Sequence, residues 1–270
     1  TLNSCKDLTD EDLRLLKGQQ WIGWLDLSGT QITDAGLENI EEFDSLRVLG
    51  LAYCENVGNS GIAYLHNLES LQRLCLQGTP IGDEGMRHLA RLWELEVLEL
   101  NATTVGDQGV KHLRDLKQLR KLDLSGTEVG DKGLTYLAGL SELEVLSLWA
   151  TNVTSAGMSQ LEGLQKLYEL DLSWTEVGDN GLSHLSHLSS LKRLNLCHTK
   201  VTDMGLAQLV SCPKLRDLDL SHTNVTDAGI EHLLRCEHLT ILILRDTAVT
   251  PEGIARLQEH LPGCYISDDN

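Results

Sequence analysis

Histidine, cysteine and aspartate are the side chains of this sequence that could act as metal ligands, nucleophiles or acid–base groups. Four histidines, His88, His112, His184 and His232, recur at multiples of 24 residues, and His187 follows His184 at i,i+3. A structural zinc site needs four ligands, and no cysteine or carboxylate completes a tetrahedral set at a recognised spacing. We therefore expect no metal and no cofactor.

A cysteine nucleophile beside a histidine would be the simplest catalytic arrangement, and Cys197 directly precedes His198, with Asp219 further along. Adjacent side chains on a strand diverge, however, and no helix start that could stabilise an oxyanion is evident nearby. The sequence also lacks the G-x-x-x-x-G-K-[ST], G-x-S-x-G and H-E-x-x-H motifs. These observations predict a protein that is not an enzyme and has no catalytic residue.

Ten copies of the pattern L-x-x-L-x-L set all of these residues in register. The copies begin at Ile22, Leu46, Leu71, Leu95, Leu119, Leu143, Leu167, Leu191, Leu215 and Leu239. The interval is 24 residues, except for the second unit, which has 25. The shared sequence is L-x-x-L-x-L-x-x-T-x-V-[TG]-D-x-G-L-x-x-L-x-x-L-x-x, and positions are numbered from its first leucine. Such a period indicates a repeat architecture.

Each unit is predicted to contain a short strand, a turn and a helix. Leu122 and Leu124 should point inward from the strand, while Lys121, Asp123 and Ser125 should point outward. Position nine is threonine in nine units and Cys54 in the second. We expect these threonines to be buried, with hydroxyl groups that satisfy backbone groups at the turn.

Position thirteen forms a column of aspartates that could be mistaken for a metal or acid–base array. The column contains Asp10, Asp34, Asp83, Asp107, Asp131, Asp179, Asp203 and Asp227, with Asn59 and Ser155 as substitutes. We expect these residues to be helix N-caps, with Thr250 and Pro251 in that role in the last unit.

The helix that begins near position thirteen should form the outer layer of each repeat. The glycine two residues after the aspartate, such as Gly36, should allow close approach of neighbouring coils. Leu134, Leu137 and Leu140 should form a buried stripe on the helix. Cys212 and Cys236 occupy the last position of that stripe, which predicts core fillers rather than nucleophiles or ligands.

The ten units resemble the leucine-rich repeat superfamily, and the "T-D-x-G-L-x-x-L" segment is similar to its 24-residue cysteine-containing and GALA-like types. The resemblance implies an α/β right-handed solenoid, or horseshoe, with a parallel sheet on the concave face and helices on the convex face. We expect residues 1–270 to form one domain. Residues 1–21 would be an N-terminal partial repeat or cap, 22–262 the ten repeats, and 263–270 a C-terminal partial strand or cap.

The composition restricts the class of partner. With 22 basic and 40 acidic side chains the net charge is −18, which disfavours nucleic acid and anionic membrane surfaces and leaves basic protein surfaces plausible. No apolar stretch is long enough for a membrane span, and no signal peptide is evident. Seven scattered cysteines favour reduced thiols and an intracellular, cytoplasmic setting, with a secreted effector as the alternative.

The outward positions three, five, seven and eight are where function can reside, and bulky residues gather there in the second half of the array. Trp149, Trp174, His198 and His222 lie on four successive coils. They are flanked by Glu169, Asp171, Arg193, Asn195, Asp217, Asp219 and Arg245. Exposed tryptophans ringed by charge are typical of an interaction hot spot, which predicts a partner-binding patch. The alternatives are that Trp174 only covers the sheet edge and that the carboxylates form a solvated face.

We therefore expect a monomeric, non-catalytic protein-interaction module that binds a protein or peptide, one with basic residues in particular, through the concave and strand-end surface. The two histidines would make the contact pH-sensitive. One alternative is the substrate-recognition part of a larger enzyme assembly, such as a ubiquitin ligase receptor or a bacterial effector. A repeat protein with no tight partner is the other.

Overall fold

The computed structural model describes residues 7–268. The chain forms two compact units, Thr1–Val129 and Gly130–Asn270. The caps predicted for 1–21 and 263–270 lie partly outside the described residues, and the single-domain organisation stays a prediction. Within residues 7–268, no helix combines the length and the apolar character needed to cross a bilayer.

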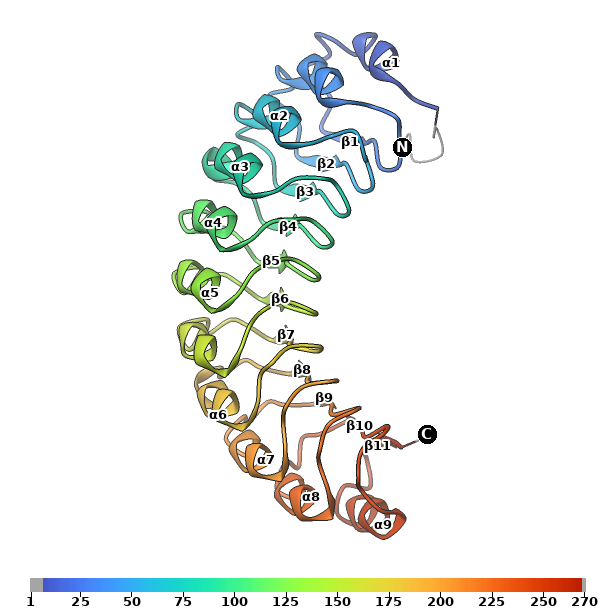
Figure 1. The fold of residues 1–270 in the computed structure, drawn as a ribbon, viewed down its shortest axis with the longest axis vertical. Coiled ribbons are helices and arrows are strands. Elements are labelled where there is room, and N and C mark those ends of the chain that lie inside the picture. Colours follow the sequence, from blue (N-terminus) through green and yellow to red (C-terminus); the bar gives the residue numbers. More distant parts are fainter. Residues whose placement is uncertain (1–6, 269–270) are drawn as a thin grey trace. The chain divides into compact units, whose positions relative to one another are not determined.

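The first unit alternates short strands with short helical segments. Its elements are α1 (Asp10–Arg14), β1 (Trp24–Asp26), η1 (Asp34–Ile40), β2 (Val48–Gly50), α2 (Asn59–Ile62), η2 (Ala63–Leu65), β3 (Arg73–Cys75), α3 (Asp83–Met86), η3 (Arg87–Arg91), β4 (Val97–Glu99), α4 (Asp107–Val110), η4 (Lys111–Leu113) and β5 (Lys121–Asp123). The strands pair in parallel and in register, so that Leu25, Leu49, Leu74, Leu98 and Leu122 stand opposite one another. Strands line one side of this unit and helical segments the other (Figure 1).

The second unit repeats the arrangement. Its elements are α5 (Asp131–Leu137), β6 (Val145–Ser147), η5 (Ser155–Leu161), β7 (Glu169–Asp171), α6 (Asp179–Leu182), η6 (Ser183–His187), β8 (Arg193–Asn195), α7 (Asp203–Leu209), β9 (Asp217–Asp219), α8 (Asp227–Leu233), β10 (Ile241–Ile243), α9 (Pro251–His260) and β11 (Tyr265–Ser267). Here too the strands are parallel, with Leu146, Leu170, Leu194, Leu218, Leu242 and Ile266 in register. The predicted α/β solenoid is therefore present in both units.

Leucines fill the core at the positions that the repeat predicts. Leu122, Leu124, Leu134 and Leu140 are fully buried. Cys212 is buried as well, whereas Cys236 is only half-buried, so the role of core filler fits Cys212 better than Cys236.

The threonines of position nine have the predicted structural role. Thr127 and Thr175 are buried, and their hydroxyl groups donate to the carbonyl oxygens of Leu124 and Leu172 at 2.6 and 2.5 Å. The bond closes the turn that follows each strand, and at Leu124 it adds to the bond that the same carbonyl accepts from the amide of Thr127 at 3.3 Å.

Position seven differs from the prediction. Ser125 was expected to point outward, but it is buried, because its hydroxyl donates to Oδ1 of Asp123 at 2.5 Å and its amide donates to the same oxygen at 3.0 Å. Ser173 and Ser221 make the same pair of bonds with Asp171 and Asp219. These three serines belong to the turn, whereas Trp149 at the same position is exposed.

The predicted N-cap role of the aspartate column is wrong. The N-cap is the residue before the aspartate: Thr202 caps α7 with a side chain that accepts from the amide of Met204, and Gly178 caps α6 without a side-chain bond. The aspartate instead accepts hydrogen bonds from the following coil. Oδ1 of Asp179 accepts from the amide of Thr202 at 2.8 Å and Oδ2 from its hydroxyl at 2.6 Å.

This bridge recurs along both units. In the first, Asp10 accepts hydrogen bonds from the amide and hydroxyl of Thr33. In the second, the same two bonds are accepted from the corresponding threonines by Asp131, Asp203 and Asp227. The column is therefore a series of links between consecutive coils. In the last repeat the prediction is correct, since Thr250 caps α9 with Pro251 at the first helical position.

The glycine two residues after the aspartate allows the close approach that the sequence predicted. A Cβ atom placed on Gly205 would lie 2.5 Å from Oδ1 of Asp179 on the preceding coil. Real Cβ atoms do not come this close to an oxygen, so glycine is required for the bridge to form.

Candidate partner-binding surface

Position eight, directly after each strand, has an unusual backbone conformation. Its φ angle is positive in each of the ten repeats, and three of these residues are glycine: Gly29, Gly78 and Gly126. The non-glycine residues are Tyr53, Ala102, Ala150, Trp174, His198, His222 and Asp246, with φ between 51° and 57°. The left-handed region costs a residue with a Cβ atom about 1–2 kcal/mol. The glycine column in the sequence was the signal for this conformation.

The large position-eight residues of the second unit form one continuous stack. The rings of Trp174 and His198 lie 3.9 Å apart at 31°, and those of His198 and His222 lie 4.0 Å apart at 14°. Nε2 of His222 lies 3.3 Å from Oδ2 of Asp246. We call Trp174, His198, His222 and Asp246 the ridge. Sequence analysis missed Asp246, although it occupies the same column.

The ridge remains accessible despite its internal contacts. Trp174 is 56% exposed and His222 is also exposed. Trp149 is 45% exposed at the end of β6, one coil before Trp174. The stack therefore covers part of each ring and leaves a large aromatic surface open to solvent.

The surroundings of His198 shift its pKa. The pKa of His198 is lowered, first by partial burial and then by the nearby His222, while Asp246 opposes the shift. The shift favours the uncharged form of the His198 ring, which suits its position in the stack.

The charged residues predicted to flank the patch lie on the exposed face of β7–β10. Arg193 stands between two carboxylates: Nη1 is 3.1 Å from Oε2 of Glu169, and Nε is 3.2 Å from Oδ2 of Asp217. Arg245 lies apart from this group, and its Nε donates to the hydroxyl of Ser267 at 3.3 Å.

The position-five residues form a second row beside this ion-pair group. Asp171, Asn195 and Asp219 stand opposite one another on β7, β8 and β9. Each uses one oxygen to hold the turn of its own strand, as Oδ1 of Asn195 does when it accepts from the amide of Cys197 at 3.0 Å. We call these three residues the polar row.

A depression of about 200 Å³ lies over the row. Its lining consists of Glu169, Leu170, Asp171, Arg193, Leu194, Asn195, Asp217, Leu218, Asp219, Ile241 and Ile243. Four carboxylates and one guanidinium face this space, so its field is negative. All the flanking residues predicted from the sequence line it, except Arg245.

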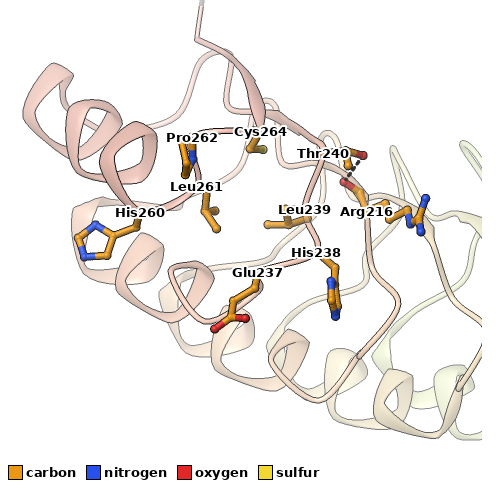
Figure 2. A pocket seen from close by; sticks show the side chains of 10 residues that line it. Arg216, Glu237, His238, Leu239, Thr240, His260, Leu261, Pro262 and Cys264 are labelled. Carbon is orange, nitrogen blue, oxygen red and sulfur yellow. Dashed lines mark hydrogen bonds between the residues drawn. The ribbon is translucent and has the colours of Figure 1, made fainter.

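A larger cavity, of about 610 Å³, lies where α8 and α9 lead into β10 and β11, and no residue pattern predicted it. Figure 2 shows its histidines, His238 and His260, apart from each other, with Glu237 between them in the view. Burial raises the pKa of the Cys264 thiol in the wall, which keeps the sulfur protonated and a poor nucleophile.

The histidine column on the helices has one feature that spacing did not predict. Oε1 of Glu162 lies 2.6 Å from Nδ1 of His184 and 3.8 Å from Nδ1 of His187. Among residues 7–268, however, no three histidine, cysteine or carboxylate side chains are arranged to hold a metal ion.

Comparison with known proteins agrees with the coil architecture. The family described as "Leucine-rich repeat region" matches residues 27–259. No curated protein matches the sequence. Among solved structures, the chain is similar to an internalin (InlF) of Listeria monocytogenes, with 20% identity and a TM-score of 0.66 over 100% of this chain and 88% of that one.

Two further structures are complexes. The ectodomain of the Arabidopsis thaliana receptor kinase GASSHO1/SCHENGEN3, solved with CASPARIAN STRIP INTEGRITY FACTOR 2, has 19% identity and a TM-score of 0.65, over 93% of this chain and 31% of that one. Mouse RP105, in its complex with MD-1, has 19% identity and a TM-score of 0.68, over 88% and 40%. At these identities the structures establish the fold, and the family match covers most of the sequence. The chain therefore belongs to the leucine-rich repeat family.

Proposed function

We propose that this chain is a non-catalytic recognition module that binds a protein or peptide through the sheet face and strand ends of its second unit. The supporting observation is the ridge, where four residues with side chains, one on each of four successive coils, occupy a backbone conformation that glycine adopts without cost. Strain of this kind concentrates at functional sites. Here it holds aromatic rings at the surface, where they can contact a partner.

The charges support a partner with basic residues. Four carboxylates line the depression beside the ridge, and Arg193 is engaged by two of them. A cationic partner would find complementary charge there, which raises association rates and fixes orientation. The complexes formed by two of the structural neighbours are consistent with such a role. The monomeric state and the intracellular setting remain predictions from the sequence.

The test is partner capture by the double variant Trp149→Ala, Trp174→Ala. Alanine already occupies the left-handed conformation at Ala102 and Ala150, so the variant should keep its backbone and its melting temperature. Trp93→Ala is the matched control, because Trp93 is 51% exposed and lies outside the patch.

We expect the double variant to lose its partners, measured as at least a tenfold drop in proteins recovered and quantified by mass spectrometry. The control should retain them. Equal recovery by both variants, or loss of the fold in the double variant, would show that the patch is not the binding surface.

A further inference from the structure

The sheet face next to the ridge offers hydrogen-bonding groups at a regular spacing. In the polar row, Oδ1 of Asp171 and of Asp219 holds the turn through Ser173 and Ser221. Within residues 7–268, no donor reaches Oδ2 of either aspartate. The row therefore presents an acceptor, the Asn195 amide and a second acceptor on three consecutive strands.

The spacing of this row identifies the backbone conformation that fits it. Adjacent strands are ~4.8 Å apart, so Asp171 and Asp219 are separated by about 9.6 Å. A polyproline II helix advances ~3.1 Å per residue and has three residues per turn, so the side chains at i and i+3 are about 9.3 Å apart on one face. In an extended strand, side chains on one face repeat at ~6.7 Å.

The charges on the row indicate which side chains of a crossing segment would lie over Asp171 and Asp219. Arg193 forms ion pairs with Glu169 and Asp217 at position three, whereas Asp171 and Asp219 form no ion pair among the described residues. Two basic residues at i and i+3 of a crossing segment would each meet one of these carboxylates. Arginine suits this site because its planar guanidinium pairs with carboxylates and stacks on aromatic rings.

The ridge provides the second contact. A polyproline II helix has three faces, and when one face lies on the polar row, a neighbouring face turns toward the strand ends, where Trp174, His198 and His222 form their stack. Aromatic surfaces are what proline-rich segments dock against. The third face remains in solvent.

We propose that the second unit binds a proline-rich segment in the polyproline II conformation, with arginines at i and i+3 over Asp171 and Asp219 and prolines against Trp174. This inference rests on the proposed function and specifies its ligand.

The first test compares two capped peptides of identical composition and charge. One is Pro-Pro-Arg-Pro-Pro-Arg-Pro-Pro, and the other, Pro-Pro-Pro-Arg-Arg-Pro-Pro-Pro, has adjacent arginines. Fluorescence anisotropy of labelled peptides at about 150 mM salt should give a Kd at least threefold lower for the spaced peptide. General attraction to acidic surface would favour the adjacent pair, so equal binding, stronger binding of the adjacent pair, or no binding would overturn the proposal.

The second test uses the double variant Asp171→Asn, Asp219→Asn. Asparagine retains the oxygen that holds the turn, as Asn195 does in the native chain. The variant should therefore stay folded and lose the preference for the spaced peptide. Asp123→Asn is the control, because Asp123 holds the same turn through Ser125 but lies in the other unit.

Failure of this inference differs from failure of the proposed function. If protein partners are still captured through Trp149 and Trp174 but neither peptide binds, the ligand assignment is wrong and the recognition surface stands. If the tryptophan variants leave capture unchanged, the recognition surface itself is wrong.

Discussion

Replacing Ala150 by glycine should stabilise the second unit, because Ala150 has a φ of 52° at a position where glycine is free of strain. Relief of the left-handed conformation contributes about 1–2 kcal/mol. The larger conformational freedom of glycine in the unfolded chain removes about 0.4–1 kcal/mol of this. We expect a net gain of about 0.5–1 kcal/mol in the free energy of unfolding.

Trp174→Gly gives the same relief of strain but removes a ring that stacks on His198 at 3.9 Å. An aromatic pair of this kind contributes about 0.5–1.5 kcal/mol. The two effects nearly cancel, so we expect the stability of this variant to be close to that of the native protein, while partner binding is lost.

Urea unfolding followed by far-ultraviolet circular dichroism measures both variants. With an m-value of about 2 kcal/mol/M, Ala150→Gly should raise the midpoint by about 0.25–0.5 M. A lower midpoint for Ala150→Gly would refute the strain reasoning. A loss of more than about 2 kcal/mol in Trp174→Gly would show that the tryptophan is a structural cover of the sheet edge.

Three further predictions concern the coil links, the ridge and a buried thiol. Asp179→Ala should lower the free energy of unfolding by about 2 kcal/mol, since two hydrogen bonds from Thr202 are lost; Asp179→Asn should cost less, and equal losses in urea titrations would contradict this. The pKa of His198 is lowered in the folded state, so the contribution of this residue to stability is complete above its ordinary pKa of about 6.5 and declines as the pH falls. His222→Gln should raise the pKa of His198 toward the ordinary value in an NMR titration. An unchanged pKa would count against the stack. Burial raises the pKa of Cys212 to about 12, so iodoacetamide at pH 8 should label this thiol only in urea, and rapid native labelling seen by mass spectrometry would disprove its burial.

The sequence predicted the parts of the fold that depend on contacts within a single 24-residue repeat. Leu122 lies inward because strand alternation requires it, and Thr127 bonds to a carbonyl only three residues away. The aspartate column was misassigned because Asp179 binds a residue 23 positions later, and a local capping rule does not consider such a partner. Ser125 was misassigned because Asp123 draws its hydroxyl into the turn.

For the candidate site, the columns predicted which residues would be neighbours but not how they would contact one another. That His198 and His222 share a column implied proximity, since parallel strands in register place equal positions side by side. The stacking geometry depends on the left-handed backbone, which the glycines at the same position already indicated. The cavity near Cys264 arises from loops around the last coils, where the repeat pattern ends.

The aspartate links also bear on how such a chain can change its length during evolution. Each link joins position thirteen of one coil to position twelve of the next, and the links Asp179–Thr202 and Asp203–Thr226 use the same two residue types. Duplication or deletion of a 24-residue segment, for example from Asp179 to Thr202, would therefore recreate the bond at the new junction without a compensating mutation. Pro251 occupies position thirteen in the last unit, and its side chain offers no acceptor. Unequal recombination could thus alter the number of coils anywhere before Pro251, while a coil joined directly after it would need a new means of attachment.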